Sequence, residues 1–123
     1  MTIREPKPTT KLKYLLVDDH AGFRNLLKQF IPGEHGTILE CSNGEEAVEL
    51  YRAAQPDWTI MDIDMPVKNG LQAAIEILQE DPEARIVFVS QHDSEDFRAQ
   101  ARSAGVQAYI SKDHLSELTA FLS

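Results

Sequence analysis

Several polar residues of this chain come directly after a short apolar segment, at the point where a buried strand would end. They are Asp18 with Asp19, Asp62, Ser90 and Lys112. A carboxylate can act as a nucleophile or bind a hard cation, and an ammonium group can hold an anionic oxygen. These residue types could therefore bind a divalent cation and transfer an anionic group, provided that the fold brings them together.

The stretch Trp58–Gly70, WTIMDIDMPVKNG, gives the sharpest of these signals. Its first four residues are apolar and predict a buried strand that runs into the carboxylate of Asp62. Pro66 has no backbone N–H and stops the strand ladder, and Gly70 allows the turn into the next helix. Open α/β sheets present reactive groups in this way at their carboxyl edge. We therefore predict that Asp62 is a nucleophile that accepts a phosphoryl group.

The rest of the pattern predicts five strands that alternate with five helices. Short apolar runs predict the strands Lys13–Val17, Thr37–Cys41, Trp58–Met61, Ile86–Val89 and Ala108–Ser111. Helical spacing and capping residues predict helices at about Phe23–Phe30, Glu45–Ala54, Leu71–Gln79, Ser94–Gly105 and Leu115–Leu122. Such alternation is typical of a doubly wound α/β fold, a five-stranded parallel sheet with helices on both faces. Right-handed crossovers favour the flavodoxin-like strand order 2-1-3-4-5.

All strands of a parallel sheet end at the same edge, so the polar residues that follow these strands are expected to be neighbours. The carboxylates of Asp18, Asp19 and Asp62 would repel one another and need a counter-charge. Mg²⁺ prefers oxygen ligands and takes one or two carboxylates directly, and Lys112 adds a further positive charge. The cation and Lys112 together could hold the oxygens of a phosphoryl group, which is most of the work in phosphoryl transfer.

Each of these residues also has a simpler explanation when it is taken alone. Asp18 and Asp19 could cap a helix, and Lys112 could be a solvated side chain. Their joint placement at one sheet edge favours a site instead. The histidines lack zinc-ligand spacing, so we expect no metal role for them. They are His20, His35, His92 and His114.

The chain resembles the receiver domain of two-component response regulators. The matching motifs are VDD at Val17–Asp19, DIDMP and a following glycine over Asp62–Gly70, Ser90, and YISK at Tyr109–Lys112. The resemblance covers essentially the whole chain beyond its N-terminal tail. It implies that Asp62 is the phosphoacceptor, that Mg²⁺ is the cofactor and that Lys112 contacts a phosphoryl oxygen. The implied metal-site residues are Asp19, Asp18 through a water, Asp62, and Asp64 through its backbone carbonyl.

The resemblance also implies a conformational switch. The hydroxyl of Ser90 would move toward the phosphoryl group, and Tyr109 would rotate inward behind it. The surface formed by the fourth helix, the fifth strand and the fifth helix would then change shape and be read by a partner. The positions that tune the lifetime of the aspartyl phosphate are Asp64, Gln91 and His92.

Two positions depart from the pattern of this family. Gln91 stands where the family usually has a small residue, and its longer side chain is expected to crowd the mouth of the site. Asp113 stands where the family often has proline after the lysine. A cis bond between Lys112 and Asp113 would cost about 2.5–4 kcal/mol, because Asp113 is not proline.

Composition narrows the partners and the location. The chain has 123 residues and a net charge of −8, which predicts one domain over residues 12–123 with a disordered tail at Met1–Lys11. The acidic surface disfavours direct nucleic-acid binding. We expect no membrane span, a cytoplasmic location and an inert, buried thiol at Cys41. The resemblance implies that a sensor histidine kinase or phosphotransfer protein acts upstream and that an output domain or protein acts downstream. It also allows a homodimer to form on phosphorylation.

Two alternative functions stay open at this point. A pseudo-receiver would act purely as a binding adaptor, although the complete set of acids and lysine argues against it. A phosphatase of the haloacid-dehalogenase type would use Asp62 and Asp64 as paired acids, but its nucleophilic strand comes first in the chain. The favoured function is a signalling module, which is not an enzyme except toward the phosphorylation and dephosphorylation of its own aspartate.

Overall fold

The computed structural model describes residues 11–33, 36–91 and 94–123. The strands are β1 (Lys13–Val17), β2 (Thr37–Cys41), β3 (Trp58–Met61), β4 (Ile86–Ser90) and β5 (Ala108–Ser111). They form one parallel sheet in the order β2-β1-β3-β4-β5, which confirms the predicted flavodoxin-like order. Four strands have the predicted bounds. The fourth is one residue longer than predicted, because Ser90 pairs with Ser111 of β5. Most of the predicted N-terminal tail, residues 1–10, lies outside the described residues.

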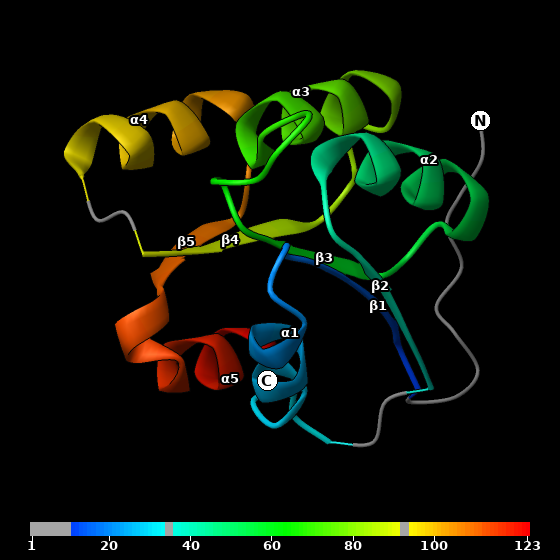
Figure 1. Ribbon diagram of the computed structural model, residues 1–123, viewed down its shortest axis with the longest axis vertical. Coiled ribbons are helices and arrows are strands. Elements are labelled where there is room, and N and C mark those ends of the chain that lie inside the picture. Colours follow the sequence, from blue (N-terminus) through cyan, green and yellow to red (C-terminus); the bar gives the residue numbers. More distant parts are fainter. Residues whose placement is uncertain (1–10, 34–35, 92–93) are drawn as a thin grey trace.

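Helices cover both faces of this sheet. They are α1 (Ala21–Lys28), α2 (Gly44–Ala54), α3 (Gly70–Glu80), α4 (Glu95–Ala104) and α5 (Ser116–Leu122), with a short 3₁₀ helix η1 (Lys112–His114). Helices α2, α3 and α4 lie on one face, and α1 and α5 lie on the other (Figure 1). In the described part of the chain, no helix combines the length and the apolar character needed to cross a bilayer.

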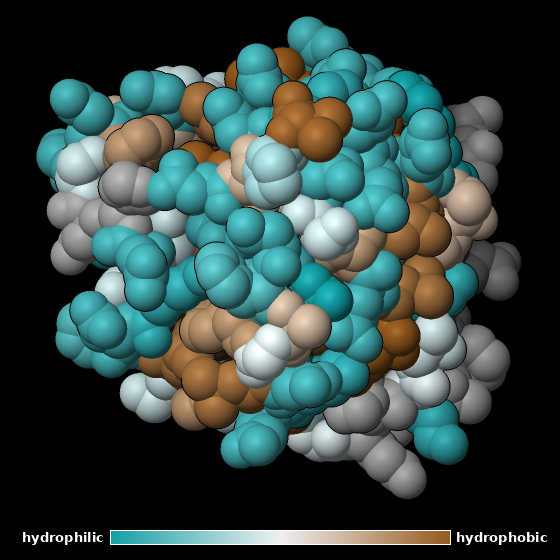
Figure 2. All heavy atoms as spheres, viewed as in Figure 1, coloured by the Kyte–Doolittle hydropathy of each residue, from teal (hydrophilic) through white to brown (hydrophobic). Residues whose placement is uncertain are grey.

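The central strand β1 shows why the sheet is apolar on both sides. Leu15 and Val17 pack in the core under α2 and α3, whereas Tyr14 and Leu16 pack in the core under α1 and α5. All four side chains are at most 2% exposed. A strand buried on both faces reads as a continuous apolar run, so the pattern of β1 follows from its central place. The face of the molecule seen in Figure 2 is largely hydrophilic, with hydrophobic residues in several separate areas.

Side-chain caps set the starts of three helices. Asn43 caps the N-terminus of α2, and Asn69 caps that of α3 in a capping box with Gln72. Ser94 caps α4, where its side chain accepts a hydrogen bond from the Phe97 N–H. Each cap satisfies a backbone donor that the helix itself leaves unpaired. The predicted cap at Ser94 is confirmed. So is the predicted end of α4 at Gly105, which takes the left-handed conformation with φ of 97°.

Candidate functional site

The ends of β1, β3 and β5 bring three charged side chains into direct contact. The Lys112 Nζ lies 2.9 Å from Asp18 Oδ2 and 3.2 Å from Asp62 Oδ2. The residues Asp18 and Asp62 are 1% and 6% exposed, and the Lys112 side chain is 11% exposed. One ammonium group therefore bridges two buried carboxylates that are far apart in the sequence. The structure places these three residues together at the carboxyl edge of the sheet, as expected for residues that follow parallel strands.

Burial and charge oppose each other in this group. Burial raises the pKa of Asp62 above its usual value, and Asp18 adds to the effect, while the Lys112 ammonium works against it. Burial alone would lower the pKa of Lys112, but the hydrogen bonds and charges of Asp18 and Asp62 outweigh it and raise that pKa. Lys112 therefore stays charged, and the two carboxylates carry more negative charge than it offsets. Such a site attracts a further cation.

The turn after β1 adds a carboxylate and an imidazole. The His20 Nδ1 lies 3.2 Å from Asp19 Oδ1 and 3.6 Å from Asp18 Oδ1. One ligand atom from each of the three residues lies within 4.8 Å of the others, so the group could hold a metal ion. The spacing of the histidines did not reveal that His20 belongs to this group. The only signal available was that it follows the two acids directly.

The loop between β3 and α3 is held close to Asp62. The Asp64 N–H donates to Asp62 Oδ1 at 3.4 Å, and the Gly70 N–H donates to the Ile63 carbonyl at 2.8 Å. Gly70 stands where the loop turns into the next helix, as predicted, and the structure adds a reason for glycine there. It is the first residue of α3 and does not need a positive φ, but a Cβ there would lie 2.1 Å from the carbonyl oxygen of Asp62. Gly70 is required because the backbone passes so close to Asp62.

The two predicted switch residues come from β4 and β5. Ser90 is the last residue of β4 and is fully buried, rather than following the strand as predicted. Tyr109 is half-buried, and its ring meets the Phe88 ring edge-on with centroids 6.4 Å apart. The Arg98 guanidinium of α4 lies 4.8 Å from the centre of the Tyr109 ring, and its Nη1 donates to the Tyr109 carbonyl at 3.2 Å. Tyr109 is thus joined to α4 as well as to the core.

The mouth of the site is a hollow of about 770 Å³ beside the turn after β1. Gln91 and Asp113 line it together with Asp19, His20, Phe23 and Lys112. The exposed side chain of Gln91 therefore stands at the rim, where it was expected to crowd the opening. Among the described residues no peptide bond is cis, so the bond between Lys112 and Asp113 is trans. His92, predicted to tune the phosphate lifetime, lies outside the described residues.

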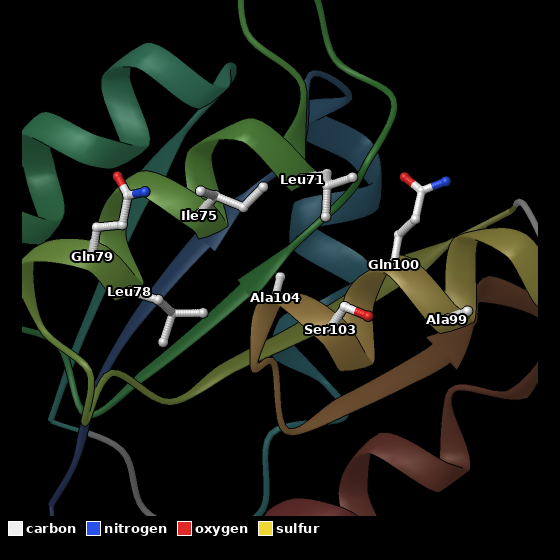
Figure 3. A pocket seen from close by; sticks show the side chains of 8 residues that line it. All are labelled: Leu71, Ile75, Leu78, Gln79, Ala99, Gln100, Ser103 and Ala104. Atoms are coloured by element: carbon white, nitrogen blue, oxygen red, sulfur yellow. The ribbon is translucent and has the colours of Figure 1, made fainter.

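A second hollow, between α3 and α4, has different chemistry (Figure 3). It measures about 590 Å³. Its lining residues are Leu71, Ile75, Leu78, Gln79, Ala99, Gln100, Ser103 and Ala104. Among the described residues that line it there is no carboxylate, imidazole, amine or thiol, so they offer neither a cation site nor an activated nucleophile. The chemistry therefore belongs to the edge that carries Asp18, Asp62 and Lys112.

Comparison with known proteins agrees with this geometry. The family model described as response regulator receiver domain matches residues 14–123. The chain is 40% identical over 98 residues to chemotaxis protein CheY of Halobacterium salinarum, covering 80% of this chain and 82% of that protein. It is 34% identical over 101 residues to nitrate/nitrite response regulator protein NarL of Escherichia coli, covering 80% of this chain but 47% of that protein.

Solved structures show the same likeness. A chain of the CheX–CheY–BeF₃–Mg²⁺ complex from Borrelia burgdorferi matches with 25% identity and a TM-score of 0.79, covering 91% of this chain and 90% of that one. The strand order, the family match over nearly the whole described chain and these relatives all agree. The chain belongs to the response regulator receiver domain family.

Proposed function

We propose that Asp62 is the residue that accepts the phosphoryl group in this signalling domain, with Mg²⁺ as the cofactor. The observation that carries the proposal is the Lys112 ammonium, which touches the carboxylates of both Asp18 and Asp62. Receiver domains belong to two-component signalling, so the donor is a phosphohistidine of a sensor kinase or phosphotransfer protein. We assign residues 12–123 to the receiver domain and the preceding residues to the tail.

The donor set fits Mg²⁺, a hard cation that prefers oxygen ligands. Asp19 would bind it directly and Asp18 through a water, and Asp62 and the Asp64 carbonyl would complete the protein ligands. The excess negative charge around Lys112 supports this assignment, because a divalent cation offsets the repulsion between the buried acids. When bound, the cation would neutralise the charge that develops on the transferred phosphoryl oxygens.

The chain's own residues perform the transfer. A carboxylate oxygen of Asp62 forms a bond to phosphorus while the bond from phosphorus to the donor atom breaks, and the leaving group keeps the electron pair. Lys112 is within reach of Asp62 and can move its hydrogen bond to a phosphoryl oxygen. Hydrolysis returns the Asp62 carboxylate and inorganic phosphate. These two reactions are the whole of the catalysis that we assign to the chain.

The phosphoryl group is then read through Ser90 and Tyr109. The buried Ser90 hydroxyl would hydrogen-bond the phosphoryl group, and Tyr109 would follow it inward. Because Arg98 of α4 contacts both the ring and the carbonyl of Tyr109, that movement would pull on α4. The surface of α4, β5 and α5 would thereby change for a downstream output domain or protein. The CheY of the Borrelia burgdorferi complex, solved with CheX, is one example of a receiver with a protein partner.

Intact-mass spectrometry tests the proposal. The protein is incubated with acetyl phosphate, with Mg²⁺ or with EDTA, and the gain of one phosphoryl group is measured. We expect the adduct with Mg²⁺, little without it, and none in Asp62→Asn. The matched control is Glu49→Gln, which removes an exposed acid of α2 outside the site and keeps the adduct. An adduct that persists in Asp62→Asn would place the nucleophile elsewhere, and a wild-type protein that gains no mass would overturn the assignment.

A further inference from the structure

One arginine on α1 makes contacts in two directions beside the proposed metal site. The Arg24 Nη1 donates a hydrogen bond to the backbone carbonyl of Asp18, and its Nε donates to Glu40 Oε1 at 2.9 Å. The Arg24 side chain is 16% exposed, and its bond to the Asp18 carbonyl is partly buried, whereas its bond to Glu40 lies at the surface. The guanidinium thus joins the end of β1 to the outer strand β2, although it carries no group that could ligate a cation.

The Asp18 carbonyl matters because it shares a rigid peptide unit with Asp19. The peptide plane contains the Asp18 oxygen and the Asp19 nitrogen, so a bond to one fixes the direction of the other. Two further bonds hold the same turn, since the Asp18 N–H donates to the Cys41 carbonyl and the His20 N–H donates to Asp18 Oδ1 at 2.8 Å. Among the side chains that hold this turn through hydrogen bonds, that of Arg24 can be changed without removing a proposed metal ligand.

Glu40 keeps the guanidinium in place and offsets its charge. Its other oxygen, Oε2, lies 2.9 Å from Lys28 Nζ, so one carboxylate accepts from two cations of α1. The hydrogen bond from Lys28 and then that from Arg24 lower the pKa of Glu40 below its usual value. A planar guanidinium can donate to a carbonyl and a carboxylate at once, whereas a lysine ammonium at this position has no such fork.

We propose that Arg24 is a positioning residue for the metal site, one that orients Asp19 by holding the Asp18–Asp19 peptide. The inference rests on the proposed function, because it assumes that Asp19 binds Mg²⁺. The proposal predicts a change in Mg²⁺ affinity opposite to the one expected from charge alone. Removing a positive charge near a cation site should strengthen cation binding by electrostatics alone. If Arg24 orients a ligand, its removal weakens binding instead, as loss of outer hydrogen-bonding partners does in other metal sites.

The test is calorimetric titration of the metal-free protein with Mg²⁺. We expect Arg24→Gln to weaken Mg²⁺ binding about tenfold. The matched control is Lys28→Gln, which removes a positive charge from the same helix and the same Glu40; the Lys28 ammonium contacts Glu40 and Asn25. Its affinity should equal or slightly exceed that of the wild type. At saturating Mg²⁺ the Arg24→Gln protein should be phosphorylated at the wild-type rate, because only the apparent affinity for the cation has changed.

Each other outcome has a definite meaning. If Arg24→Gln binds Mg²⁺ as tightly as Lys28→Gln does, the positioning role is wrong while the metal site stands. If the wild type itself binds no Mg²⁺, both the metal site and this inference fall. If Arg24→Gln does not fold, Arg24→Lys serves instead, since it keeps the charge and loses the fork. It should still bind Mg²⁺ more weakly than the wild type, and equal binding overturns the proposal.

Discussion

The ring of Phe23 lies directly beneath the ammonium group of Lys112, with Nζ 4.2 Å from the ring centroid. This contact comes from α1, whereas the two carboxylates that touch Lys112 come from β1 and β3. The ammonium group is thus held by two acids and one aromatic face. Phe23 is therefore more than a member of the apolar face of its helix, because it also limits where Lys112 can point.

We expect Phe23 and Lys112 to be energetically coupled. Cation–π contacts are worth about 0.5 kcal/mol at exposed sites and about 2 kcal/mol when desolvated. A double-mutant cycle with Phe23→Leu and Lys112→Met, measured by urea unfolding, should give a coupling of about 1 kcal/mol. Phe30→Leu is the control, because Phe30 packs against the same core while the aromatic contact of Lys112 is with Phe23. Equal coupling for Phe23 and Phe30 would contradict the contact.

Asp62→Asn should stabilise the protein when no metal is present. The buried carboxylate of Asp62 is disfavoured by desolvation and by Asp18, and the amide keeps its shape without the charge. We expect a gain in the free energy of unfolding at neutral pH with EDTA. Asp64→Asn, at an exposed position, should change stability by less than about 0.5 kcal/mol. A less stable Asp62→Asn protein would mean that the attraction of Lys112 outweighs burial.

Two glycines should respond in opposite ways to the same substitution. Gly70→Ala places a Cβ 2.1 Å from the Asp62 carbonyl oxygen, so the backbone next to the nucleophile must shift. We expect a loss of about 2 kcal/mol or more, because overpacking forces such shifts. Gly22→Ala, in α1, meets nothing within 4 Å and should gain about 0.5 kcal/mol from the lower entropy of the unfolded chain. Denaturant unfolding measures both, and equal effects would contradict the close approach.

Cys41 should resist alkylation in the native protein. Burial raises the pKa of its thiol to about 12, with the charge of Glu46 adding to the effect. At pH 8 the thiolate fraction is then about one in ten thousand, and the side chain is shielded as well. Iodoacetamide should label the protein only after urea is added.

The same thiol should make stability depend on pH. Because the pKa of Cys41 is higher in the folded protein than in the unfolded chain, ionisation of the thiol favours unfolding as the pH rises above about 9. Cys41→Ala should lack this alkaline loss of stability, and rapid native labelling would contradict the burial.

The sequence could predict the sheet and the meeting of the acids with Lys112, since parallel strands end at one edge whatever their side chains do in detail. It could not predict contacts that depend on how separate elements approach one another, such as Phe23 beneath Lys112 or Arg24 on the Asp18 carbonyl.

The first helix shows a limit of predicting helix ends from apolar periodicity. Apolar spacing continues to Phe30, but α1 ends at Lys28. The next two residues form tighter bonds, from the Gln29 and Phe30 N–H groups to carbonyls three residues back.

The β3–α3 loop contains a backbone conformation that its residue does not favour. Val67 has φ of 69° and is 76% exposed, so a β-branched side chain occupies the left-handed region with little burial in return. We expect Val67→Gly to stabilise the protein by about 1 kcal/mol, since the left-handed region costs a non-glycine residue about 1–2 kcal/mol. Val67→Ala keeps a Cβ and should give almost none of this gain, as measured by urea unfolding. If alanine and glycine have the same effect, the backbone at Val67 is not strained, and the loop near Asp62 holds its shape for another reason.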